Sequence, residues 1–124
     1  MTPVLLIAFN RPEETAKVIA RLRSVKPAVV YFAVDGSRRD RPEEIQLVYQ
    51  TQKLVTEFDW DCRLHTFFQS KNLGCGLGVS TAISWALKNE DSVIVLEDDV
   101  LPEPSFFLFC RELLERYRDD DKVF

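Results

Sequence analysis

Short runs of apolar residues alternate with amphipathic stretches along the chain. Four runs are rich in β-branched, aliphatic or aromatic residues, as strands covered on both faces are: residues 4–9, 29–34, 64–68 and 93–96. After each run, apolar residues recur every three or four positions, which is the spacing of one helix face. The order of elements is therefore strand then helix, repeated four times. It predicts an α/β fold, with a mostly parallel sheet, right-handed crossovers and helices on both faces.

The expected helices are recognised by their start signals and apolar faces. The first begins at Pro12, whose missing N–H suits a first turn, and is followed by two acids that favour the positive end of the helix dipole. The second begins with the same Arg-Pro-Glu-Glu sequence at residues 41–44, a generic helix start rather than an internal repeat. The third is expected over residues 79–88 and the fourth over 106–117, before a further strand start at 122–124. The expected apolar faces are Thr15, Val18, Ile19 and Leu22, then Leu47, Val48, Val55 and Phe58, then Ala82, Ile83 and Ala86.

Composition and charge narrow the class of protein. The net charge is −4 and the 16 Lys and Arg residues are scattered, so there is no basic stripe for nucleic acid. No stretch approaches the roughly 20 apolar residues of a membrane span, and the first apolar run is too short for a targeting signal. The three cysteines are odd in number and widely spaced, and His65 is the only histidine. We therefore expect one cytoplasmic domain over residues 1–124, with reduced thiols, a packed His65 and no zinc site.

Polar residues directly follow three of the expected strands. They are Asn10 and Arg11, then residues 35–37 (Asp-Gly-Ser), then residues 97–99 (Glu-Asp-Asp). Parallel strands end at the same edge of a sheet, and ligands of open α/β sheets bind beyond that edge. The sequence therefore predicts a binding site where these three segments meet.

The three adjacent acids at residues 97–99 call for a positive partner, because neighbouring carboxylates repel one another and are costly to desolvate. In an extended chain Glu97 and Asp99 point to one side and Asp98 to the other. Mg²⁺ or Mn²⁺ is often held by one or two carboxylates, with water and substrate phosphates completing its shell. The triplet therefore predicts a metal site that accepts a diphosphate, and the alternative is a solvated loop after a strand.

Gly74, Gly76 and Gly78 precede the third expected helix with a spacing one residue short of the dinucleotide-binding fingerprint. They also follow the third strand rather than the first. We interpret them as a tight turn with close helix packing, rather than as a phosphate-binding loop.

Residues 94–117, IVLEDDVLPEPSFFLFCRELLERY, resemble the acidic metal motif and following helix of nucleotide-sugar glycosyltransferases with the GT-A fold. The likeness is greatest to glycoprotein N-acetylglucosaminyltransferases, whose Glu-Asp-Asp, proline and Phe-Phe pair match residues 97–99, Pro104, Phe106 and Phe107. PVLLIAFNRPEE and VVYFAVDGS resemble their first two strands, and KNLGCGLGVSTAISWAL resembles the Asn-x-Gly turn and helix of family 2 transferases. The likeness runs through essentially the whole chain and implies a GT-A-like, Rossmann-like nucleotide-binding half.

The resemblance also implies roles for individual residues. Asp99 would bind Mn²⁺ or Mg²⁺ directly, Asp98 would contact the ribose, and Glu97 would contact the donor sugar or ribose. Asp35 would accept a hydrogen bond from the nucleobase, expected to be uracil, and Arg11 would lie near the base or phosphates. The rest of the expected donor site is Ala8, Phe9, Asn10, Gly36, Lys71 and Asn72.

The expected protein is the donor-binding part of a glycosyltransferase that uses a UDP-linked sugar and an unidentified glycan, lipid or protein acceptor. Its catalytic base is unknown and expected beyond Phe124, so the domain is expected to be truncated after the acidic motif and inactive alone. One alternative is a non-catalytic module that binds a nucleotide sugar or a partner. Another is a sugar nucleotidyltransferase, which would need a glycine-rich loop after the first strand. Trp60, Phe106 and Phe107 are expected to be exposed where a second copy could pack as a homodimer.

Overall fold

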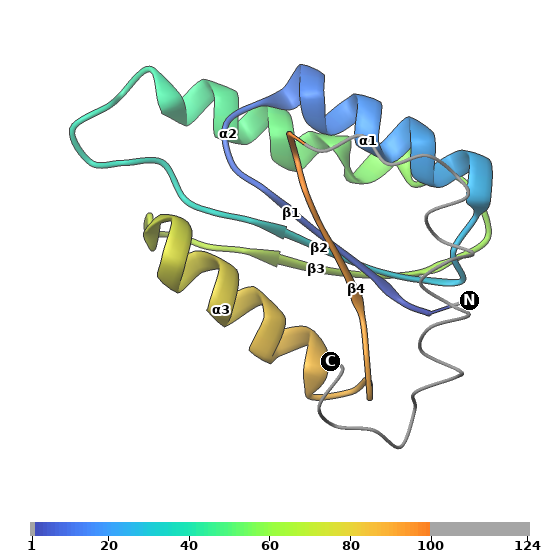
Figure 1. Ribbon diagram of the computed structural model, residues 1–124. Helices are drawn as coiled ribbons and strands as arrows, with labels where there is room; N and C mark the ends of the chain where they lie inside the picture. Colours follow the sequence, from blue (N-terminus) through green and yellow to red (C-terminus); the bar gives the residue numbers. More distant parts are fainter. Residues whose placement is uncertain (1, 100–124) are drawn as a thin grey trace.

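A parallel four-stranded sheet forms the centre of the molecule in a computed structural model that describes residues 2–99 (Figure 1). The strands are β1 Val4–Ala8, β2 Val29–Val34, β3 Arg63–Phe68 and β4 Ile94–Glu97, in the order β3-β2-β1-β4. β1 pairs in parallel with both β2 and β4, and β2 pairs in parallel with β3. Along the chain, β2 and β3 are added on one side of β1, and β4 then pairs with the other side of β1. This reversal places a topological switch point between β1 and β4.

Helices cover both faces of the sheet, which confirms the predicted fold class. Helix α1, Pro12–Val25, and helix α2, Glu44–Gln52, lie on one face, and helix α3, Gly74–Leu87, lies on the other (Figure 1). A 3₁₀ helix, η1, Lys53–Glu57, follows α2 directly. The expected fourth helix, the expected strand start at 122–124 and Cys110 lie outside the described residues. No helix within residues 2–99 is long and apolar enough to cross a membrane.

Helix α1 forms as its sequence predicts. Pro12 occupies its first turn, and the buried residues are the four predicted ones, Thr15, Val18, Ile19 and Leu22. The helix ends at Lys26, which adopts a left-handed conformation with φ 51° and donates its backbone N–H to the Leu22 carbonyl at 2.8 Å. Pro27 then prevents the helix from continuing.

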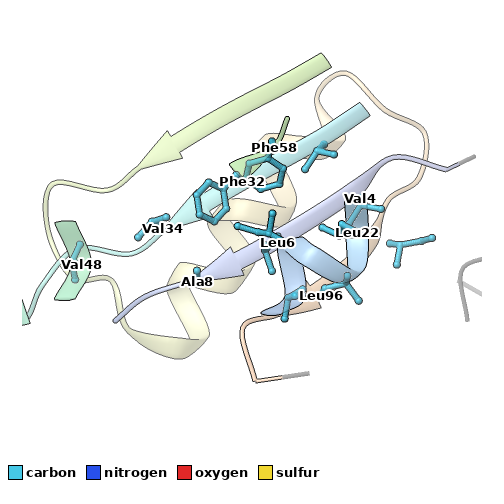
Figure 2. Close-up of a cluster of buried hydrophobic side chains, with 13 residues drawn as sticks. Val4, Leu6, Ala8, Leu22, Phe32, Val34, Val48, Phe58 and Leu96 are labelled. Carbon is cyan, nitrogen blue, oxygen red and sulfur yellow. The ribbon is translucent and has the colours of Figure 1, made fainter. Parts of the chain in front are cut away.

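The larger hydrophobic layer lies between the sheet and the helices α1 and α2 (Figure 2). Alternate residues of β1, β2 and β4 point into it, as the two-residue period of a strand requires. Leu6, Phe32 and Leu22 are completely buried at its centre. The full set is Val4, Leu6, Ala8, Val18, Ile19, Leu22, Val30, Phe32, Val34, Val48, Phe58, Ile94 and Leu96.

The smaller layer, between the sheet and α3, is built around one tyrosine. Its buried members are Leu5, Tyr31, Ala33, Ala82 and Ala86. The Tyr31 ring stacks on His65 with centroids 4.6 Å apart and meets Trp85 edge-on at 5.1 Å. Its hydroxyl donates to Glu90 Oε2 at 2.7 Å, and burial, followed by this bond, raises the pKa of Tyr31 to about 12. The prediction that His65 is a packed strand residue is confirmed.

Three local predictions are wrong. Helix α3 begins at Gly74 and so contains the glycines that were expected to precede it. Gly74 enters the helix with φ 83°, a conformation that costs a glycine little. The second helix ends at Gln52, and Phe58 reaches the core only after the tighter turns of η1. Trp60, which was expected to be exposed, is partly buried against the core, and its indole N–H donates to the Pro27 carbonyl at 2.9 Å.

Candidate functional site: a cleft at the carboxyl ends of the strands

A cleft of about 390 Å³ opens beyond the carboxyl ends of β1, β2 and β4. Asn10 and Arg11 line it after β1, Asp35 after β2, and residues 97–99 at the end of β4. The three polar strand ends therefore meet in one site, as the parallel topology predicts. Ala8, Phe9 and Asn72 of the expected donor site also line the cleft, whereas Gly36 and Lys71 do not.

Small residues make room for the cleft on the α3 side of the sheet. Gly74, Gly78 and Ala82 of α3 and Ala33 of β2 all line it. A methyl group on Gly78 would lie 3.3 Å from Asp35 Oδ2, so glycine lets the helix approach that carboxylate closely. The interpretation of close packing therefore holds for Gly78, whereas a Cβ atom on Gly74 or Gly76 would meet nothing within 4 Å.

The acidic triplet closes one end of the cleft. Glu97 is the last residue of β4, and Asp98 and Asp99 form the turn that follows. Glu97 and Asp99 are exposed, whereas Asp98 is half-buried between them. Burial raises the pKa of Asp98 above its ordinary value, against the opposing effect of the Arg11 charge. The triplet therefore presents two carboxylates to solvent and turns one towards the end of β1.

This donor set fits a cation that completes its shell from the substrate. Within residues 2–99, no three side chains of the His, Cys, Asp or Glu type come together as a self-sufficient metal cage. Mg²⁺ and Mn²⁺ do not require one, since one or two carboxylates with water and phosphate oxygens are enough. The exposed carboxylates beside the cleft meet that requirement, and the assignment of Asp99 as the direct ligand stays a prediction.

The carboxylate of Asp35 is fully engaged by the chain itself. Oδ1 accepts the backbone N–H groups of Gly36 at 2.8 Å and Leu73 at 2.9 Å. Oδ2 accepts the N–H of Gly74 at 3.1 Å and the Asn72 amide at 3.2 Å. A carboxylate offers about four lone-pair sites, so these bonds leave Asp35 little capacity for a ligand. In this structure Asp35 fixes the start of α3 to the end of β2, and base reading by Asp35 stays a prediction.

Asn72, Gly36 and Lys71 complete this connection, and of the three only Asn72 also lines the cleft. The Asn72 amide also donates to the Gly36 carbonyl at 2.9 Å. A Cβ atom on Gly36 would lie 2.6 Å from the carbonyl carbon of Lys71, so only glycine permits this approach of the two loops. Their observed role is to hold the loop after β3 against the end of β2.

An ion pair that the sequence did not predict lies beside the residues that follow β1. Arg38 lines the cleft, and its guanidinium contacts the carboxylate of Glu44, the first residue of α2. The Glu44 side chain is only 4% exposed and also accepts the Asn10 amide at 2.9 Å. These partners lower the pKa of Glu44 to about 2, and the hydrogen bond from Arg38 has the largest effect. The only sequence sign was the acidic start of the second helix, which does not show that the acid is buried.

The sheet order and the polar cleft at its switch point define a nucleotide-binding α/β protein of the Rossmann-like GT-A type. The sequence profile of glycosyl transferase family 2 matches residues 4–124, which is nearly the whole chain. The chain therefore belongs to glycosyl transferase family 2, whose members take a nucleotide-sugar donor and an acceptor. A search of curated proteins and a search of solved structures each found no match.

Proposed function

We propose that the cleft binds a UDP-linked sugar together with Mn²⁺ or Mg²⁺, as the donor-binding part of a glycosyltransferase. The observation that carries the proposal is the convergence of three polar strand ends, one of them a carboxylate triplet, at the switch point of the sheet. Family membership accounts for the donor class. The titration described below tests the choice of UDP and of these cations.

The arrangement of charge along the cleft suggests how a donor would lie. The anionic end is formed by residues 97–99, and the neighbouring Arg11 provides a cation for phosphate oxygens. A divalent ion held at the triplet would neutralise negative charge that develops on the diphosphate leaving group. The nucleoside would then extend towards the ends of β1 and β2, with its base near Phe9 and Asp35.

The test is calorimetric titration of UDP, with GDP as the comparison, into the 124-residue chain with Mn²⁺ and then with EDTA. We expect binding that needs the metal and prefers UDP. Asp99→Asn should abolish it because the charge that holds the cation is lost. Asp91→Asn is the matched control, since Asp91 is an exposed acid that does not line the cleft.

Equal binding of UDP with Mn²⁺ and with EDTA, or full binding by Asp99→Asn, would contradict the metal assignment. Equal affinity for UDP and GDP would contradict the choice of base while leaving the cleft as a nucleotide site. No nucleotide binding by the unmodified chain would overturn the proposal as a whole.

A further inference from the structure

The Arg38–Glu44 pair is more rigidly built than a surface ion pair. Glu44 Oε1 accepts both the backbone N–H and the Nε–H of Arg38 at 3.0 Å, while Oε2 contacts Arg38 Nη2 and the Asn10 amide. A carboxylate buried to this degree is costly unless it is paired and hydrogen-bonded, and here it is both. Glu44 therefore fixes the direction of the Arg38 side chain with contacts to its backbone and to its guanidinium.

The consequence of this anchoring is a cation held at the nucleoside end of the cleft. The Arg38 guanidinium lies over the ring of Phe9, 5.9 Å from its centroid, and both residues line the cleft. Glu44 occupies the Nε and Nη2 edge of the guanidinium, and Nη1 makes no hydrogen bond within residues 2–99. The Arg38 side chain is 44% exposed, so a ligand that lies against Phe9 can approach it from solvent.

Arg38 and the acidic triplet come from strands that are not neighbours in the sheet. Arg38 follows β2, whereas the acidic triplet follows β4, and β1 lies between these two strands. At the β2 end, the acceptor positions of Asp35 are already filled by the chain's own donors. The guanidinium of Arg38 is thus a polar group at that end that still has hydrogen-bonding capacity.

We propose that Arg38 is a base-binding residue that donates through Nη1 to a carbonyl oxygen of the nucleobase, and that Glu44 is its positioning residue. The inference rests on the proposed function, because it assigns part of the same cleft to the base of the donor. Uracil has two ring carbonyl oxygens that can accept this bond. A bare diphosphate has no base and cannot use it.

The experiment compares the affinity for UDP with that for inorganic pyrophosphate, both in the presence of Mn²⁺. Arg38→Lys keeps a cation for Glu44 but removes the planar group and its Nη1 donor. We expect it to weaken UDP binding about tenfold, as the loss of one charge-assisted hydrogen bond would. Pyrophosphate binding should not change. Arg39→Lys, at an exposed neighbouring position that does not line the cleft, should change neither.

Glu44→Gln tests the positioning role, since the amide has the same shape but no charge to hold the guanidinium. UDP affinity should fall while pyrophosphate affinity stays constant, and Arg38→Lys should add little further loss in the double variant. Thermal unfolding of each variant, measured in parallel, shows whether the fold is retained at the temperature of the titration.

The outcomes separate this inference from the proposed function. UDP binding that is unaffected by Arg38→Lys would overturn the inference alone and leave the pair as a connection between the loop and α2. Equal weakening of UDP and pyrophosphate would also overturn it, since the loss would not depend on the base. An unmodified chain that binds pyrophosphate with Mn²⁺ but gains no affinity from the uridine would overturn both.

Discussion

The two faces of the sheet are packed in different ways. Towards α1 and α2, the described part of the chain buries mainly large aliphatic and aromatic side chains such as Leu6, Leu22 and Phe32. Towards α3, three of the five buried residues are alanines, and the bulk comes from Leu5 and Tyr31. Small side chains at the start of α3 leave the space that becomes the cleft. The layer towards α1 and α2 therefore provides most of the hydrophobic stabilisation. The layer towards α3 is less filled by side chains, and the space that remains forms the cleft.

The two layers are also held together by different forces. The α1 layer depends on apolar contacts along the whole length of the helix, whereas the start of α3 is fixed to the sheet by hydrogen bonds to Asp35. Apolar burial is non-directional and is spread over many residues. The hydrogen bonds of a single carboxylate are directional and stabilise only the segment that donates them, here the start of α3. Substitutions in the two layers should therefore change stability and binding in different proportions.

The largest loss of stability is expected in the α1 layer. Leu6→Ala removes a completely buried side chain and should lower the free energy of unfolding by about 2–5 kcal/mol. Urea unfolding measures the change, and the folded fraction should still bind UDP with Mn²⁺. Leu77→Ala in α3 is the matched control, because Leu77 is 59% exposed and should change stability little. Similar losses for the two variants would contradict the contrast between the layers.

A smaller and more local loss is expected at Asp35. Asp35→Ala removes the acceptor of four hydrogen bonds and should cost about 1–3 kcal/mol. Hydrogen exchange should accelerate mainly at the amides of Leu73 and Gly74, while α1 stays protected. The same substitution at exposed Asp91 provides the control. If exchange accelerated equally in α1 and α3, Asp35 would be part of the general core rather than an anchor for α3.

The stabilising effect of Tyr31 should disappear at high pH. Tyr31→Phe removes the bond to Glu90 and should cost about 1 kcal/mol at pH 7. Because the pKa of Tyr31 is raised to about 12 in the folded chain, from 10 in the unfolded one, its contribution is complete below pH 10. It is lost as the pH rises from 10 to 12. The stability difference between the unmodified chain and Tyr31→Phe should shrink over that interval, as measured by urea unfolding; a constant difference would contradict this.

The smallest change in stability is expected at the acidic end of the cleft. Asp99 is exposed, so Asp99→Asn should change the free energy of unfolding by less than about 0.5 kcal/mol. The same variant should lose metal-dependent binding of UDP. A large loss of stability would instead mean that the triplet is a structural turn.

The sequence by itself determined the order of the elements and the position of the site. The apolar runs of β1 and β2 and the periodic face of α1 are local patterns, and a chain of four such strands with crossover helices has few ways to pack. Once the sheet is parallel, the residues that follow its strands must meet at one edge. That is why the cleft containing Asn10, Arg11 and residues 97–99 could be predicted without coordinates.

Only the tertiary structure decided what the individual polar groups do there. The sequence places an aspartate after β2 but does not show that its oxygens accept N–H groups from residues 73 and 74. Nor does it show that Glu44 is buried against Arg38 and Asn10, because helix propensity is the same for an exposed and a buried acid at a helix start. Arg38 is six residues from Glu44, but the contacts of Asn10 with Glu44 and of Asp35 with Leu73 join segments more than thirty residues apart in the chain. They are fixed by the packing of the sheet and helices, which bring those segments together.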